Sequence, residues 1–232
     1  MSSPPDLVEK PKRNEFTLTP NKRIFLVFLV CCVQMIYIPT SNRVTGGIEP
    51  KLPIDIVPIW PVWVLPYVLC YVLWLGGIAW IIFKVDDRSF RSIMAACLLT
   101  FALGASIFIF FPTYVKPATF EGNDIFSAIL RTIHETWGRY DAFPSGHVYI
   151  STLLALFYSR WYPRRKFLWV LILVTISFST LFTGQHYILD VLGGYLFALA
   201  GYYFGLWWSG LYGAPKQTRK RPGKRIASSS MN

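Results

Sequence analysis

Residues 167–209 read FLWVLILVTISFSTLFTGQHYILDVLGGYLFALAGYYFGLWWS. This stretch holds two apolar runs, 167–183 and 187–209, joined by a short polar segment that contains His186. Each run approaches the roughly 20 residues that a helix needs to cross the hydrocarbon core of a bilayer. The stretch therefore predicts two consecutive membrane helices with a histidine at the turn between them.

The rest of the chain repeats this apolar pattern. Of the 232 residues, 53% are hydrophobic and only 15% are charged, whereas soluble domains carry about 25% charged residues. Four more apolar runs cover 24–39, 57–83, 91–111 and 147–163. Together the six runs predict an all-α integral membrane six-helix bundle over residues 21–212.

The two ends of the chain differ from this bundle in composition. Residues 1–20 are polar and contain several prolines, lysines and glutamates, and residues 213–232 are basic and end in a serine-rich segment. Neither end has enough apolar side chains to bury a core. We expect two disordered cytoplasmic tails, 1–20 and 213–232.

Basic residues indicate the orientation of the bundle. With the N-terminus in the cytoplasm, 18 of the 23 lysines and arginines fall on the cytoplasmic side. The other five are Arg43, Lys51, Lys116, Arg131 and Arg139. This asymmetry predicts cytoplasmic termini, with the connection 112–146 on the extracytoplasmic or lumenal face and the plasma membrane favoured. Because the charge of +11 is spread over loops rather than one face, we expect no nucleic acid partner.

Polar residues at the outer ends of the apolar runs are the candidates for chemistry. His147 and His186 both fall at predicted helix starts, where backbone N–H groups and the helix dipole favour an anion. Asp190 follows His186 by four residues, so its carboxylate can reach the imidazole on one helix face. Such a carboxylate fixes the tautomer of a nucleophilic or proton-transferring histidine. A purely structural His–Asp pair is the alternative interpretation.

Three further residues complete the candidate site. Ser145 and Gly146 precede His147, where a hydroxyl and an uncovered backbone can contact an anion, although Pro-Ser-Gly is also ordinary turn chemistry. Lys116 is a candidate phosphate ligand, with an interfacial lysine reaching lipid phosphates as the alternative. Four nearby residues are left out of the candidate site, because the solvated face of a loop helix explains them: Arg131, His134, Arg139 and Asp141.

The segments Lys116-Pro117, Pro144-Ser-Gly-His147 and His186 with Asp190 resemble the three motifs of the type 2 phosphatidic acid phosphatase superfamily. The resemblance covers about residues 55–205 and implies a membrane enzyme that needs no metal or other cofactor. It implies that His186 attacks phosphorus, Asp190 orients it and His147 protonates the leaving alcohol. Ser145 and Gly146 would hold phosphate oxygens, and Lys116 would neutralise charge.

Two positions depart from the phosphatase pattern, because Ile109 and Thr180 stand where that branch has a lysine and an arginine. The Gln-His-Tyr-x-x-Asp-Val form looks more like the inositol phosphorylceramide and sphingomyelin synthase branch, which transfers a phospho-head-group to an alcohol. The expected partner is thus a lipid phosphate or phospholipid, and the expected activity is lipid phosphatase with transferase as the alternative.

Two other classes stay open. A non-catalytic membrane scaffold or transporter would keep the fold without the chemistry. A metal-dependent hydrolase would use His147, His186 and Asp190 as ligands.

Overall fold

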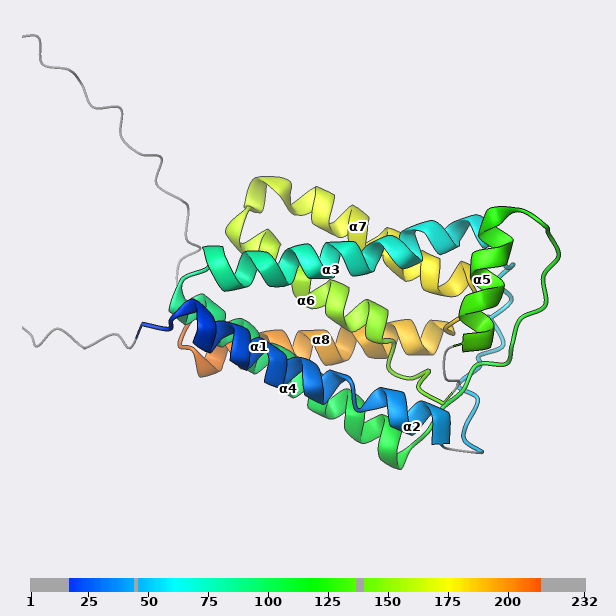
Figure 1. Ribbon diagram of the computed structural model, residues 1–232, viewed down its shortest axis with the longest axis horizontal. Coiled ribbons are helices and arrows are strands. Elements are labelled where there is room, and N and C mark those ends of the chain that lie inside the picture. Colours follow the sequence, from blue (N-terminus) through cyan, green and yellow to red (C-terminus); the bar gives the residue numbers. More distant parts are fainter. Residues whose placement is uncertain (1–16, 44–45, 137–139, 214–232) are drawn as a thin grey trace, which may run out of the picture.

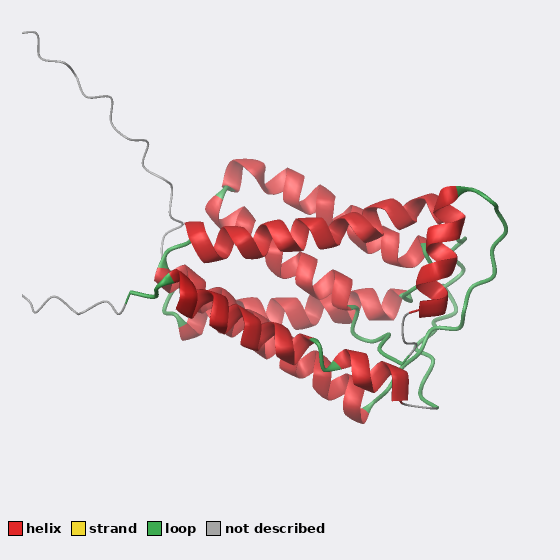
Figure 2. Ribbon diagram, in the orientation of Figure 1, coloured by secondary structure: helices red, strands yellow, loops and turns green. Residues whose placement is uncertain are grey.

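The computed structural model describes residues 17–43, 46–136 and 140–213, and these residues fold into helices without strands (Figure 2). Two short 3-10 turns, Pro61–Trp63 and Pro163–Arg165, precede α3 and α7. The helices are α1 (Pro20–Gln34), α2 (Tyr37–Arg43), α3 (Val64–Lys84), α4 (Asp87–Phe110), α5 (Ile125–Thr136), α6 (Gly146–Trp161), α7 (Lys166–Phe182) and α8 (Ile188–Trp208). The tails 1–16 and 214–232, for which disorder is predicted, lie outside the described residues.

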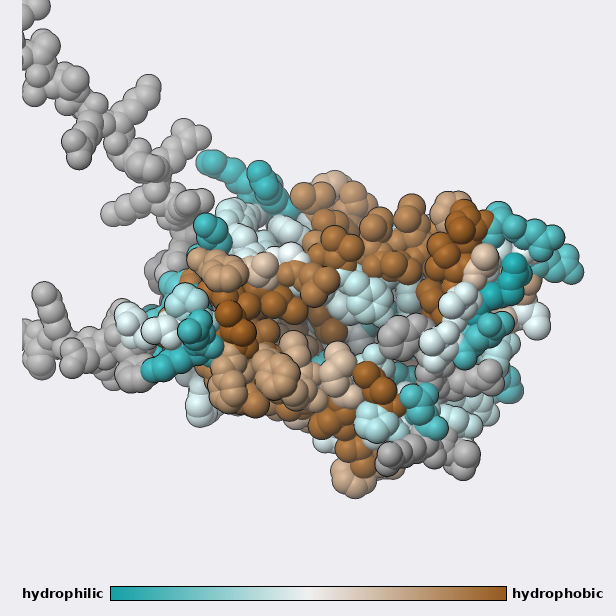
Figure 3. Space-filling view, viewed as in Figure 1, coloured by the Kyte–Doolittle hydropathy of each residue, from teal (hydrophilic) through white to brown (hydrophobic). Residues whose placement is uncertain are grey.

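The long helices run side by side, and α5 lies across one end of the bundle (Figure 1). Apolar side chains cover the flank of the visible face, and hydrophilic ones gather at its two ends (Figure 3). Within the described residues, five helical segments are long and apolar enough to cross a membrane. The protein is therefore all-helical and has the character of a membrane protein.

The predicted sixth span is not confirmed. It corresponds to α6, whose 16 residues extend only about 24 Å at 1.5 Å per residue, against a hydrocarbon core of about 30 Å. The helix starts at Gly146, within one residue of the predicted start, and ends at Trp161, two residues before the predicted end. The segment before it is non-helical and lies inside the bundle, where Ala142, Pro144 and Ser145 are buried.

Helix α8 is the central support of this segment. On one face, a Cβ at Gly201 or Gly205 would collide with Thr100 and with the backbone of Ser92 in α4. On another face, a Cβ at Gly194 would lie 2.8 Å from Val148 Cβ and 3.0 Å from the Ser145 carbonyl oxygen. Small residues let membrane helices approach closely, so α8 can contact both α4 and the start of α6.

Helix α5 confirms that a loop helix lies near Arg131 and His134. Its Leu130 and Ile133 are buried, whereas Ile125 and Ile129 are exposed. Leu130 and Ile133 pack against Val64 and Tyr67 of α3, so these two residues form the inward face of α5.

Arg23 joins three helices at the opposite end of the bundle. Its guanidinium donates to the carbonyl oxygens of Ile82 and Val85 at 3.0 and 2.6 Å and forms an ion pair with Asp87. The arginine is 8% exposed. A buried charge is costly unless it is paired, so this contact fixes α1 against the α3–α4 turn.

We expect Arg23→Ala to destabilise the protein by about 3 kcal/mol, because it leaves a carboxylate and helix-end carbonyls without their donor. The measurement is the thermal unfolding midpoint of the detergent-solubilised protein. Lys84→Ala is the matched control, since Lys84 is exposed at the same end. Equal midpoints for the two variants would show that Arg23 does not hold the helices together.

Candidate active site

The three motif segments meet at the α5 end of the bundle. Thr113 forms isolated bridges with both Ile48 and Asp141, and its hydroxyl oxygen accepts the N–H of Phe143 at 2.7 Å. The connection from α4 is thereby joined to the segment that leads into α6. Residues far apart in the sequence form one wall behind the two histidines.

Asp190 links the two histidine segments. Its Oδ2 accepts the backbone N–H of Tyr187 at 2.8 Å and lies 3.5 Å from His186 Nδ1, an ion-pair distance. Its backbone carbonyl accepts the N–H of Ser145 at 3.0 Å. The carboxylate is fully buried, and the His186 side chain is 9% exposed. The predicted proximity of His186 and Asp190 is confirmed.

The N-terminus of α8 does not offer the free N–H groups that the sequence predicts. The Asp190 carboxylate takes the N–H of Tyr187, and Asp55 Oδ1 accepts the N–H of Ile188 at 2.8 Å. His186 itself lies just before the helix, with its backbone N–H bonded to the Thr180 carbonyl at 3.1 Å. Two carboxylates therefore cap α8, and an anion would be repelled from this helix end.

The N-terminus of α6 is different. The Ser145 hydroxyl is buried and has no hydrogen-bond partner among the described residues. Within those same residues, no acceptor is found for the backbone N–H groups of Gly146 and His147. Unpaired buried donors are costly, so this helix start is the end at which an anion would gain hydrogen bonds.

His147 is the second residue of α6 and is surrounded by aromatic rings of α3. Tyr67 stacks on it with centroids 4.2 Å apart, Trp74 lies 5.4 Å away, and the Tyr71 hydroxyl is 3.1 Å from Nε2. The imidazole centroids of His147 and His186 are 6.1 Å apart. A tetrahedral group placed between these rings can contact both.

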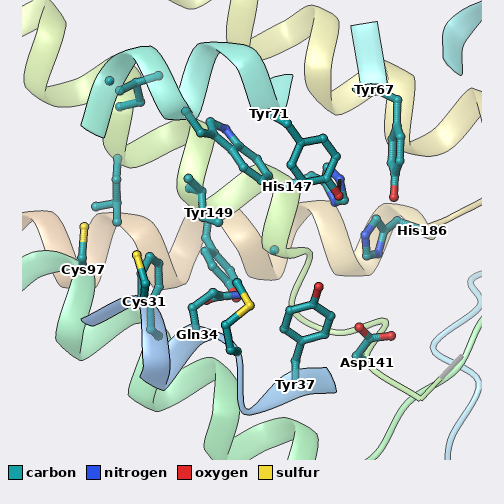
Figure 4. Close-up of a pocket in the computed structure, with 18 of the residues that line it drawn as sticks. Cys31, Gln34, Tyr37, Tyr67, Tyr71, Cys97, Asp141, His147, Tyr149 and His186 are labelled. Atoms are coloured by element: carbon teal, nitrogen blue, oxygen red, sulfur yellow. Dashed lines mark hydrogen bonds between the residues drawn. The ribbon is translucent and has the colours of Figure 1, made fainter. Parts of the chain in front are cut away.

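Both histidines line a cavity of about 340 Å³. Figure 4 shows Tyr37 and Asp141 across this cavity from the two rings. Cavities of this size hold small molecules or part of a larger one. Gly146 and Lys116 also line it.

Lys116 reaches the site but already has a partner. Its Nζ lies 2.6 Å from Glu49 Oε2, and the Tyr187 hydroxyl donates to Glu49 Oε1 at 2.6 Å. The hydrogen bond to Glu49 raises the pKa of Lys116, and the ammonium holds the pKa of Glu49 below its usual value. The lysine side chain is 67% exposed. A bound anion would compete with Glu49 for this cation.

The two positions that depart from the phosphatase pattern, Ile109 and Thr180, bring no cation to the site in the structure. Ile109 is 46% exposed on the flank of α4, and the Thr180 hydroxyl donates to the Ser177 carbonyl within α7 at 2.8 Å. Among the described residues that line the cavity there is no arginine, and Lys116 is the single permanent cation. Arg131 instead donates to the Gly122 carbonyl, and Arg139 lies outside the described residues.

Asp141 and His134 both line the cavity, although the sequence did not predict them as site residues. Burial raises the pKa of Asp141 to about 6, against a lowering by His186. His134 Nε2 lies 2.8 Å from the Thr183 carbonyl oxygen, so α5 contacts the turn before His186. Asp141 stands four residues before Ser145, and this closeness in sequence was a signal that it could belong to the site. Its side chain reaches the site only because segment 140–145 runs into the bundle.

The aromatic rings around His147 were also missed. Tyr67, Tyr71 and Trp74 follow one another at helical spacing on one face of α3, a pattern that is equally typical of lipid-facing residues. In the part of the chain that the structure describes, no three His, Cys, Asp or Glu side chains are grouped to hold a metal ion.

A comparison with known protein families gives a match that includes this combination of residues. The family model described as the PAP2 superfamily matches residues 60–204, which include Lys116, both histidine segments and Asp190. A search of curated proteins gave no match. Since the matched region covers more than half of the chain and contains the whole candidate site, the protein belongs to the PAP2 superfamily.

Proposed function

We propose that this protein is a membrane phosphoesterase that hydrolyses a lipid phosphate monoester through a phosphohistidine on His186. Membership of the PAP2 superfamily supports phosphatase-type chemistry. The observation that carries the proposal is the separation of 6.1 Å between the two imidazoles, with the Asp190 carboxylate 3.5 Å from Nδ1 of His186. A nucleophile, its orienting carboxylate and a second proton-transfer group then flank one space.

In the first step, the Nε2 lone pair of His186 forms a bond to phosphorus while the bond from phosphorus to the alcohol oxygen breaks. Asp190 next to Nδ1 stabilises the positive charge that develops on the ring. His147 in its protonated form donates its proton to the leaving oxygen.

In the second step, neutral His147 takes a proton from water, and the water oxygen attacks phosphorus. The bond from phosphorus to Nε2 breaks, and its electron pair returns to His186. The Ser145 hydroxyl and the free N–H groups at the start of α6 would hold the phosphate oxygens in both steps. No step in this scheme uses a metal ion.

Charge in the cavity favours one alternative, a lipid phosphotransferase that moves a phospho-head-group to another alcohol. Asp141 and Asp190 place two carboxyl groups near the reacting space, while Lys116 is already paired with Glu49. A phosphodiester carries one negative charge and would be repelled less than a doubly charged monoester. A non-catalytic scaffold or transporter is the third alternative.

The three functions differ in their products. Purified protein incubated with labelled lipid phosphates and phospholipids would release inorganic phosphate as a phosphatase and form a new labelled lipid as a transferase. The absence of both products across the panel would favour the non-catalytic alternative.

We expect His186→Ala to abolish turnover and His147→Ala to lower it by about 10² to 10⁴-fold, because the two residues perform separate parts of the displacement. Acid quench of the active protein should trap labelled phosphate on His186. EDTA should leave turnover unchanged. The unfolding midpoints of both variants should match that of the parent protein.

The role of His147 has its own control. A substrate with an activated leaving group, such as 4-nitrophenyl phosphate, needs no acid, so His147→Ala should retain more activity on it than on an alkyl phosphate. An equal loss on both substrates would contradict the assignment of His147 as the acid.

We expect Lys116→Ala to lower kcat/KM by about 10²-fold, the usual effect of losing one electrostatic donor to a transition state. Lys116→Arg should retain most activity, because a guanidinium contacts phosphate at two points. Lys51→Ala is the matched control, since Lys51 is exposed and does not line the cavity. If Lys116→Ala stays within about twofold of the parent, the lysine is an ordinary solvated charge.

We also propose that both termini are cytoplasmic and that the site faces the extracytoplasmic or lumenal side, from the distribution of basic residues. In a cysteine-free background, Asn123→Cys should react with a membrane-impermeant thiol reagent in intact cells, and Arg164→Cys should react only after lysis. Both residues are exposed, before α5 and between α6 and α7 respectively. The reverse pattern would invert the orientation, and reaction of neither before lysis would place the protein in an internal membrane.

A further inference from the structure

The cavity that contains the histidines continues far into the bundle. Besides the residues of the site, it is lined by Val27 of α1, Ile81 of α3 and Ile93 of α4, which lie near the Arg23 end of their helices. Along α6 the lining runs from Gly146 to Trp161. These two residues are the first and last of the helix, so the lining extends about 22 Å at 1.5 Å per residue.

The deep part of the cavity is apolar. Its walls include Ile78, Met94, Ile150 and Leu153. Phe157, Tyr158 and Trp161 of α6 lie at the far end and form what we call the aromatic floor. Trp80 packs behind this floor, with its ring centroid 5.0 Å from Tyr158 and 4.8 Å from Trp161. Neither the proposed hydrolysis nor the histidines require such a space.

A polar contact separates the two parts of the cavity. The Tyr149 hydroxyl donates to Gln34 Oε1 at 2.7 Å and so joins α6 to α1. Figure 4 shows this pair between His147 on one side and Cys31 and Cys97 on the other. A ligand that occupies the whole cavity therefore meets polar groups at one end and hydrocarbon at the other.

Two of the helices that line the cavity diverge toward its histidine end. Helices α1 and α3 both line it, and Figure 1 shows them diverging from the Arg23 end toward the α5 end. Arg23 holds them together through the carbonyls of Ile82 and Val85. The backbones of the two helices are therefore close together near the Arg23 end and farther apart near the α5 end.

We propose that this cavity binds one alkyl chain of the lipid substrate, with the phosphate at the histidines and the chain end at the aromatic floor. The proposal rests on the proposed function and names its substrate class, a phosphate ester with a long alkyl chain. A chain that fills the cavity from Gly146 to Trp161 has to extend about 22 Å. The aromatic floor therefore limits the length of the chain.

Four native cysteines provide the test. Cys31 and Cys97 line the cavity, whereas Cys32 is exposed on the outside of α1 and Cys70 is buried elsewhere. The full-length protein in nanodiscs is treated with N-ethylmaleimide in the presence of hexadecylphosphonate or butylphosphonate, and the alkylation of each cysteine is followed by mass spectrometry.

We expect hexadecylphosphonate to slow alkylation of Cys31 and Cys97 at least about fivefold, because a bound chain covers apolar walls. Butylphosphonate should not protect them, and the rate at Cys32 should not change with either compound. Equal rates at Cys31 and Cys97 with the two phosphonates would overturn the proposal, whatever the protein does catalytically.

A kinetic measurement separates this inference from the proposed function. Cys31→Phe should lower kcat/KM for hexadecyl phosphate at least about tenfold relative to butyl phosphate, since the added ring occupies the chain site. Cys32→Phe, one residue away on the exposed face, should leave the ratio unchanged. An unchanged ratio in Cys31→Phe would contradict the chain site, whereas failure of the parent protein to cleave either hexadecyl phosphate or butyl phosphate would contradict only the proposed function.

Discussion

The buried carboxylate of Asp190 is the contact on which the site depends. It caps the start of α8 through Tyr187, lies beside the His186 imidazole, and belongs to the residue whose carbonyl accepts the Ser145 N–H. In a bundle surrounded by lipid, a non-helical segment such as 140–145 can exist only where its backbone groups find partners. Asp190 therefore satisfies the local backbone and sets the distance between the two histidines at the same time.

The charges of the site are arranged unequally between its two helix ends. Carboxylates cap α8, so negative charge is already present behind His186. The start of α6 keeps its donors uncapped, and the one permanent cation lining the described cavity is held by Glu49. Electrostatics therefore favours an anion beside His147 and Ser145, at the start of α6, over one at the start of α8.

The bundle is tight at one end and open at the other. Arg23 fixes α1 to α3 and α4 where no chemistry is expected, while the same helices diverge toward the histidines. Under the proposed function, the histidine end would hold the charged group of the substrate, and the apolar part of the cavity would hold its chain.

Much of this could be predicted from the sequence. Apolar runs determined the helices, since a segment in lipid must satisfy its own backbone, and His186 with Asp190 could be paired because a helix start places residues four apart on one face. The burial of the segment before α6, the inward face of α5 and the capping of α8 by Asp55 could not be predicted, because each depends on a partner from a distant segment. The same holds for Asp141 and Glu49. Short-range periodicity determined the elements and the pairing of His186 with Asp190, whereas only tertiary packing decided which charges, aromatic rings and apolar walls surround them.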